Sequence, residues 1–461
     1  ETDKSAEVLS KVMAKADDAT VASVINNITE KNANEDSKLS LKVMADFSEK
    51  NPEKLETLAQ NSSDQIEKLT IFAVEEAESS QEDADLIAKV VAVASDELVN
   101  KVVEEVSKNS TEQNQTLSAQ VLKAIVDTEP NKLEIINDDV KDTMIKQTIE
   151  SAQNQQEGIG IQASEDMTSI VSDIIVNTNT ETGLKIIEEL NKTESESDLS
   201  LKIISDISEK DTEKLNTLSE NNKEQIQKLT EIAIKNADAS EESAQLIAKV
   251  VDKASDEIAN KVINEVTKNS VDNKEALSAK VMKSIVSINP DKIENLSDEN
   301  KDTMIQQTIN AAKNQNENKD DESDDLADVI ADIIVEADVG TSGKLIQKLD
   351  NTELKDESDL NLSILDKLSN KELYEEKLEV ISIRSKLNEN SIKNFINKSI
   401  KNVEDEVKLE KITKIIDKSE GIVNENIVES GEENEETKKK VVKIITKVIE
   451  KNPEKAIEIF D

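Results

Sequence analysis

All four prolines of this 461-residue chain fall at the same place in an internal repeat. Successive prolines are 78, 160 and 163 residues apart, which corresponds to one unit of about 80 residues followed by two double steps. A fixed period of this length is typical of a stacked array in which each unit packs mainly against its neighbours. A lysine follows each proline by two residues, at Pro52, Pro130, Pro290 and Pro453. The repeat therefore predicts an architecture, but it names no chemistry.

The repeat extends well beyond the prolines. Residues 85–91 return as 245–251, and residues 141–145 return as 301–305. Because the match weakens from residue 355 onward, we predict a regular array over 1–354 and a divergent continuation over 355–461; a separate small helical domain over 355–461 is the alternative. The chain begins with Glu1, so we expect it to have been cut from a longer or processed chain. The copies are placed at about 5–82, 83–162, 163–242, 243–322, 323–402 and 403–461, with the last one truncated.

The apolar residues follow a helical period. In the segment that begins at Leu39, residues Leu39, Val43, Met44 and Phe47 share one helix face, and the methionines are expected in the core. A net charge of −43 with 1% aromatic residues would also suit a disordered chain, but the apolar residues are patterned rather than diluted. We therefore predict an all-α solenoid, helical over more than about two-thirds of its length. HEAT or armadillo stacking serves only as an architectural analogy.

Each copy is expected to contain four long helices and one short one. Proline is tolerated in the first turn of a helix, so each proline should open the short helix, with Leu55, Leu133, Ile293 and Ala456 facing inward. If the short helix is a linker, the four long helices form two hairpins, and this is the arrangement we favour. In the first copy the five predicted helices cover residues 5–16, 19–31, 37–50, 52–60 and 64–79.

No catalytic or cofactor site is predicted. The chain has no cysteine and no histidine, which removes thiol nucleophiles, thiolate metal sites and the usual base at neutral pH. Glycine-rich phosphate loops and nucleophile elbows are missing, and carboxylates are so frequent that no single pair is informative. The sequence therefore predicts a protein that is not an enzyme and holds no cofactor.

The charge balance bears on partners. A net charge of −43 repels phosphate backbones and anionic lipid, and Arg384 is the only arginine. The lysines are interleaved with acids, as at Lys185 and Lys210, and are expected on solvated helix faces and in i, i+4 pairs. No apolar run approaches the roughly 18 residues of a membrane span. We expect self-association or another protein as partner, no nucleic acid and no membrane insertion within this segment.

One stretch invites a metal-site hypothesis. Residues 317–325 contain six carboxylates, which are the hard oxygen ligands that Ca²⁺ prefers. The stretch lacks the residue order and the glycine of a calcium loop, and the equivalent residues 156–160 of the earlier copy are hardly acidic. A charged loop between copies is favoured, with Ca²⁺ binding kept as the alternative.

Two functions fit these features. The first is a structural protein, that is, an elongated acidic spacer, a filament subunit or a cell-surface stalk. The second is a protein-binding solenoid scaffold for a basic or helical partner. A scaffold would show residues that break the repeat and cluster on one face, whereas a spacer would show faces that repeat. The compartment is not assigned, although an extracellular or cell-surface location is favoured.

The repeat count predicts a molecular length. Helix layers packed about 9–10 Å apart, two per copy, would give a body on the order of 100 Å long before any superhelical coiling. Small-angle X-ray scattering should therefore yield a distance distribution with a long tail. A distribution that fits a compact sphere of this mass would contradict the stacked array.

Overall fold

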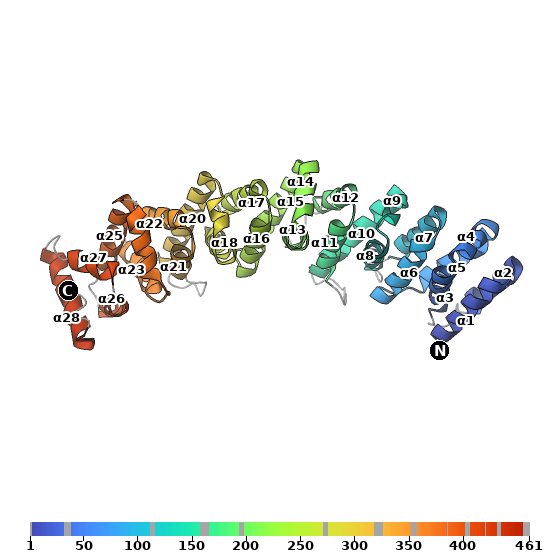
Figure 1. Ribbon diagram of the computed structural model, residues 1–461, viewed down its shortest axis with the longest axis horizontal. Helices are drawn as coiled ribbons and strands as arrows, with labels where there is room; N and C mark the ends of the chain where they lie inside the picture. The colour runs from blue at the N-terminus through green and yellow to red at the C-terminus, as the bar shows by residue number, and fades with distance from the viewer. Residues whose placement is uncertain are drawn as a thin grey trace. The chain divides into compact units, whose positions relative to one another are not determined.

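The computed structural model describes residues 2–31, 38–110, 116–156, 166–192, 198–270, 275–317, 326–351, 357–384, 386–401, 406–419, 421–430 and 435–454. Within these ranges the regular secondary structure is helical, and no β-strand is present. The helices pack in the layered arrangement described below. The chain is thus an all-α solenoid, which confirms the fold predicted from the apolar spacing (Figure 1).

The chain divides into two compact units, Glu1–Asn236 and Ala237–Asp461, called unit 1 and unit 2 here. Each is described by itself. The helices of unit 1 are α1 (Thr2–Lys15), α2 (Asp18–Lys31), α3 (Leu39–Lys50), α4 (Pro52–Asn61), α5 (Ser63–Glu75), α6 (Gln81–Val93), α7 (Asp96–Asn109), α8 (Leu117–Thr128), α9 (Lys132–Ile135), α10 (Asp138–Gln156), α11 (Met167–Asn177), α12 (Thr180–Leu190), α13 (Leu199–Lys210), α14 (Thr212–Asn221) and α15 (Lys223–Asn236).

Unit 2 has the same kind of helix succession. Its helices are α16 (Glu241–Lys253), α17 (Asp256–Asn269), α18 (Glu275–Ile288), α19 (Asp291–Glu294), α20 (Asp298–Glu317), α21 (Leu326–Glu336), α22 (Val339–Asn351), α23 (Glu357–Leu368), α24 (Tyr374–Arg384), α25 (Lys386–Lys401), α26 (Glu406–Lys418), α27 (Ile422–Ser430) and α28 (Glu435–Lys451).

Within each unit the long helices form two layers (Figure 1). Consecutive members of a layer contact one another, and each hairpin contributes one helix to each layer. Each of the first five copies therefore supplies two hairpins, as predicted, and the truncated last copy supplies the hairpin of α26 and α27 followed by α28. The first layer contains α1, α3, α6, α8, α11 and α13 in unit 1 and α16, α18, α21, α23, α26 and α28 in unit 2; the second layer contains α2, α5, α7, α10, α12 and α15 in unit 1 and α17, α20, α22, α25 and α27 in unit 2.

The short helices α4, α9, α14, α19 and α24 link the two long helices of every second hairpin. They alternate between two forms. α9 and α19 have four residues, whereas α4 and α14 have ten. The helices that follow α9 and α19 are correspondingly long, with 19 residues in α10 and 20 in α20. The chain thus keeps one hairpin geometry while dividing its residues differently between linker and second helix.

The prolines lie where the linkers begin. Pro52 is the first residue of α4, as predicted, whereas Pro130 precedes a four-residue helix and Pro290 is the N-cap of another. The third copy has no proline there. Its Asp211 caps α14 by accepting a 2.9 Å hydrogen bond from the backbone N–H of Lys214, so a capping side chain replaces the fixed φ of proline.

The residues predicted to face inward after each proline are buried wherever the structure describes them. Leu55, Leu133 and Ile293 are at most 3% exposed, as predicted. Pro453 lies two residues after the last residue of α28, and Ala456 lies outside the described residues. The inward packing of the proline corner is therefore confirmed at Leu55, Leu133 and Ile293 and stays a prediction at Ala456, and the helix after the proline is shorter in two copies than expected.

The core lies between the two layers. On α3, Leu41, Val43, Met44 and Phe47 are at most 1% exposed. Two methionines of the second layer, Met144 on α10 and Met304 on α20, are buried to the same degree, as their helical spacing predicts. Burying each such side chain stabilises the fold by about 1.5–3 kcal/mol, and most of this burial requires the neighbouring hairpin.

The lysines two residues after Pro130 and Pro290 have a structural role. Lys132 Nζ donates a hydrogen bond of 2.8 Å to the carbonyl oxygen of Ala94, which ends α6. Lys292 Nζ donates a 2.9 Å bond to Ala254, which ends α16. Each lysine places a positive charge where the C-terminal carbonyls of a helix are unsatisfied. The linker of one hairpin thereby holds the first helix of the preceding hairpin.

The same bond recurs where proline is absent. Lys214 donates to the carbonyl of Thr178 after α11, and Lys377 donates to the carbonyl of Ala337 after α21. Burial lowers the pKa of both lysines. In the first copy the bond is replaced by an ion pair of 3.1 Å between Lys54 and Asp18 at the start of α2.

The Lys132→Met variant should lose the hydrogen bond from Lys132 to the carbonyl of Ala94 while keeping the apolar part of the side chain. We expect local opening of α6 and α9 to become easier by about 1–2 kcal/mol, because a charged donor is lost from a buried carbonyl. Hydrogen–deuterium exchange of the two helices should accelerate accordingly. Lys146→Met is the control, since that side chain is 68% exposed and its contact with Glu150 spans 3.8 Å. Equal protection of α6 and α9 against exchange in both variants would contradict a stabilising role for the hydrogen bond between Lys132 and Ala94.

Candidate functional site

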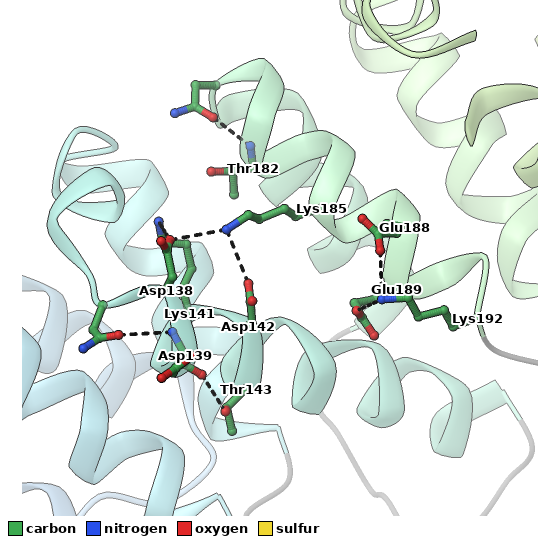
Figure 2. A network of polar contacts seen from close by, with 12 residues as sticks. Asp138, Asp139, Lys141, Asp142, Thr143, Thr182, Lys185, Glu188, Glu189 and Lys192 are labelled. Atoms are coloured by element: carbon green, nitrogen blue, oxygen red, sulfur yellow. Dashed lines mark hydrogen bonds and ion pairs between the residues drawn. The ribbon is translucent and has the colours of Figure 1, made fainter. Parts of the chain in front are cut away.

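A network of ion pairs joins α10 to α12 in the second layer of unit 1. Figure 2 shows Lys185 of α12 reaching between two carboxylates of α10. Its Nζ lies 3.3 Å from Asp138 and 3.6 Å from Asp142. Lys141 approaches the same Asp138 carboxylate to 3.4 Å. The network therefore spans two consecutive hairpins.

The network recurs in unit 2 between α20 and α22. Lys344 Nζ lies 3.1 Å from Asp298 and 3.4 Å from Asp302. Burial alone would lower the pKa of Lys344, but the hydrogen bond to Asp298 and the two carboxylate charges outweigh it and raise that pKa. The hydrogen bond from Lys344 likewise lowers the pKa of Asp298. A contact that returns at the equivalent place in the next double copy is explained by stacking and needs no ligand.

These contacts add to one sequence-based expectation. Lys185 and Lys210 are expected on solvated helix faces and in i, i+4 pairs; Lys210 is exposed and lies 3.7 Å from Asp206, as predicted, and both lysines also reach a neighbouring helix. Lys210 at the end of α13 pairs with Asp173 of α11 at 2.8 Å. A single sequence shows i, i+4 neighbours but not which helix stacks alongside, so these partners were missed. The repeat period was the signal that could have found them.

A buried ion pair fixes the start of α3 against α6. Lys38 Nζ lies 2.7 Å from Asp83, which is 1% exposed, and 2.8 Å from Glu78. At the equivalent place in unit 2, Ser243 donates a 2.6 Å hydrogen bond to Asp238 instead. An ion pair in one unit and a hydrogen bond in the other therefore engage the residues at this position, which favours a structural role for both contacts.

The buried hydroxyl groups of α8 belong to a second repeated network. Ser118 Oγ lies 2.7 Å from Ser110 Oγ and donates a 2.6 Å bond to Gln147, whose amide donates 2.8 Å to the carbonyl of Ser107. Residues 270, 278, 307 and 267 repeat the arrangement. Glutamine cannot take a proton from serine at neutral pH, so these hydroxyls are placed to satisfy buried backbone groups.

Glu76 is a half-buried carboxylate between α5 and α3. Its Oε2 accepts bonds of 2.8 Å and 3.2 Å from the backbone N–H groups of Ser40 and Leu41, in the first turn of α3. Its other oxygen is buried with no hydrogen-bond partner. Burial raises the pKa of Glu76, against the opposing effect of the backbone bonds. The other copies carry an uncharged side chain at this position, namely Asn154, Asn236 and Asn314.

An acidic cleft opens between α4, α5 and α7 in unit 1. It has a volume of about 460 Å³ and is lined by Glu56, Glu67, Asp96 and Glu97 around one lysine, Lys101. Lys101 is engaged by Glu67 at 3.0 Å. The other three carboxylates of the lining are exposed. The cleft thus offers three solvent-facing negative charges to a cationic group.

A smaller cleft lies on the first layer among α1, α3 and α6. Its volume is about 180 Å³, and the carboxylates in its lining are Asp3, Asp46, Glu49 and Glu82. Lys42 pairs with Asp3 at 2.6 Å, and Lys89 pairs with Glu49 at 3.2 Å. This cleft is more nearly neutralised from within than the first one.

The residues described here contain no group of three or more carboxylates arranged to hold a metal ion. Of the acidic stretch at 317–325, Glu317 ends α20 and the rest lies outside the described residues. The Ca²⁺ hypothesis and its charged-loop alternative therefore both stay predictions. In the described part of the chain, no helix is both long and apolar enough to cross a bilayer.

Comparison with known proteins gives no family. No protein-family model and no curated protein matches the chain. Among solved structures, the chain is similar to a circular tandem repeat protein with novel repeat topology and enhanced subunit contact surfaces, with 13% identity, 99% of this chain and 96% of that one covered, and a TM-score of 0.24. It is also similar to human Puf-A, with 13% identity, 99% and 98% coverage and a TM-score of 0.28.

A third similar structure is that of APUM23-GGAUUUGACGG, with 9% identity, 96% and 99% coverage and a TM-score of 0.24. Identities of 13% or less with TM-scores of 0.28 or less identify no relative. The helices and their two layers in this chain support the assignment of the fold, and a proposed function depends on the surface of this chain.

The environment of Glu76 predicts a pH effect. Because the folded pKa is raised, burying the carboxylate costs stability at neutral pH, and that cost disappears as pH falls through the raised value. Glu76→Gln should therefore be at least as stable as the parent chain at pH 7, and the difference should shrink toward pH 4. Urea denaturation followed by circular dichroism measures both.

The control is Glu75→Gln, which removes the same charge from an exposed neighbour on the same helix. It should show no such pH-dependent difference. Destabilisation by Glu76→Gln at pH 7 that persists at pH 4 would mean that the carboxylate is needed as a cap for α3, contrary to the burial effect.

Proposed function

We propose that this chain is a non-enzymatic solenoid scaffold that binds basic segments of other proteins through its acidic surface. The observation that carries the proposal is the different use of the two charge types. Lysines such as Lys132 and Lys292 donate to backbone carbonyls of the preceding hairpin, whereas Asp96 and Glu97 of the acidic cleft face solvent. With 100 acids against 57 bases, the charge left for partners is negative.

Chemistry supports a binding role over turnover. The sequence contains no histidine or cysteine, and the repeated buried hydroxyls are hydrogen-bonded to amides and carbonyls. A partner with clustered lysine or arginine would be steered toward the array and would find carboxylates within the cleft. The same charge disfavours nucleic acid, whose phosphates would be repelled.

A spacer or filament subunit is the second candidate. The recurrence of the Lys185 contacts at Lys344 favours it, because internally satisfied surfaces that repeat are what a length-determining array needs. Self-association of such an acidic array should strengthen with NaCl, through charge screening, and more with CaCl₂. Light scattering of the chain alone across both salts, showing growth to filaments, would favour this role over the scaffold.

The scaffold predicts salt-sensitive binding of a cationic probe. A fluorescent oligolysine peptide should bind the chain at low ionic strength and weaken by about tenfold or more between 0.05 and 0.3 M NaCl, because exposed charges are screened. Fluorescence anisotropy measures this. An oligoglutamate peptide and the RNA GGAUUUGACGG should fail to bind under the same conditions.

The cleft itself is tested by neutralising its exposed acids. The variant Glu56→Gln/Asp96→Asn/Glu97→Gln should weaken oligolysine binding several-fold. The matched control, Glu213→Gln/Glu220→Gln/Glu224→Gln, removes three exposed acids of α14 and α15 and should have a smaller effect. Equal losses in the two variants would contradict a role for the cleft, and salt-independent binding would contradict the electrostatic scaffold.

A further inference from the structure

The linker helix of the divergent fifth copy carries an exposed apolar face. Leu373, in the turn before α24, is 72% exposed, and Val380 and Ile383 on α24 are 46% and 77% exposed. Three large aliphatic side chains exposed on one linker form a candidate interaction surface. The only arginine, Arg384, ends the same helix and is exposed as well.

The equivalent linkers α4 and α14 provide an internal comparison. The register is set by Lys377, which makes the same helix-ending bond as Lys214, and by the buried residue that follows each lysine. In this register Val380 replaces a threonine and Ile383 replaces a polar residue. The equivalents are Thr57 and Gln60 in α4 and Thr217 and Glu220 in α14. Stacking therefore does not require apolar residues at these positions.

The backbone conformation of Leu373 is a second, independent observation, because it reduces stability rather than adding to it. Its φ of 58° lies in the left-handed region, which a leucine adopts only at an energetic cost. Among the described non-glycine residues only Lys38 shares a positive φ. The turn at 369–373 has no counterpart before α4 or α14, where a single residue separates the linker from the preceding helix. The chain thus uses an added, strained turn to display an apolar side chain.

The rest of α24 holds this face in place. Leu378 and Ile381 on its opposite side are 0% exposed, and Lys377 bonds to the carbonyl of Ala337. The hydroxyl of Tyr374, the only tyrosine, lies 2.5 Å from that of Ser419. A face anchored in this way is ordered before a partner arrives, which reduces the entropy lost on binding.

Acidic side chains border the apolar residues. Glu372, Glu376 and Glu379 are all exposed. At 100° per residue, Glu376, Glu379, Val380 and Ile383 fall within an arc of about 100° on α24. The helical part of this face, from Glu376 to Ile383, is about 10 Å long, or roughly two helical turns, and Leu373 lies in the turn directly before α24. The face is therefore apolar along the middle and negative along the edge formed by the glutamates, and Arg384 carries a positive charge at its C-terminal end.

We propose that this face, Leu373, Val380 and Ile383 with the acidic border, is the docking site for a basic amphipathic helix of a partner protein. The proposal rests on the scaffold function and adds a place and a second requirement, an apolar stripe on the ligand. A helix laid along α24 would pack its apolar residues on the three side chains and its lysines against the glutamates. Like charge opposes both an anionic lipid surface and a second copy of the same acidic border.

Two labelled peptides of equal composition test the site by fluorescence anisotropy. One repeats leucine and lysine so that a helix gathers its leucines on one face, and the other has the same residues scrambled. The full chain should bind the amphipathic peptide at least tenfold more tightly than the scrambled one. Leu373→Asn/Val380→Thr/Ile383→Gln should abolish that preference, because it installs the polar residues of the other linkers and a residue that tolerates the left-handed turn.

The matched control is Val93→Thr/Ile288→Gln, which alters two exposed aliphatic residues outside α24 and should keep the preference. Circular dichroism should show unchanged helicity for both variants. In addition, Glu372→Gln/Glu376→Gln/Glu379→Gln should reduce affinity for the amphipathic peptide and flatten its salt dependence.

The outcomes separate this site from the scaffold function. If oligolysine binds but the two leucine–lysine peptides bind alike, or if the α24 variant retains the preference, the docking site is overturned while the scaffold stands. If no cationic peptide binds at all, both fail. If multi-angle light scattering shows that the parent chain self-associates and the α24 variant is monomeric, the occupant is a second copy and the assignment to a partner helix is overturned.

Discussion

The contact between one hairpin and the next is the constraint on which this structure depends. A single hairpin of the array cannot cover both of its apolar faces, so residues such as Met44 and Phe47 become buried only when neighbouring hairpins stack in two layers. The linker lysines reinforce that contact at its weakest place, the end of a helix where carbonyls lack partners. Lys132 and Lys292 supply the missing donors from the following hairpin. Packing and capping thus act between the same pairs of hairpins.

The acidic character of the surface follows from composition. The sequence has 100 acids against 57 bases, so carboxylates remain in excess even where lysines pair with them, as Lys185 does with Asp138 and Asp142. Such a surface discriminates by charge at long range, but charge alone gives little geometric specificity. The proposed scaffold would gain geometric specificity from a place where shape and apolar contact add to charge.

Departures from the repeat are where that specificity can be sought. Repeated contacts, such as the Ser118–Gln147 and Ser278–Gln307 pairs, are explained by stacking because they recur wherever the same helices meet. The fifth copy instead adds a turn before α24 and exposes Val380 where the other full-length linkers carry threonine. Within a repeat protein each copy is a control for the others, so a strained or exposed residue in one copy calls for an explanation outside stacking.

The sequence by itself determined the helical class, the period, the two-hairpin copy and the burial of Leu55 and Met144, because helical spacing and proline geometry are local properties. It did not show the partner of Lys185, the shortened helices α9 and α19 or the display of Leu373. Those features depend on which helices lie side by side and on how many residues each linker takes. Only the tertiary structure decides such long-range proximity, since one sequence contains the residues but not their neighbours in space.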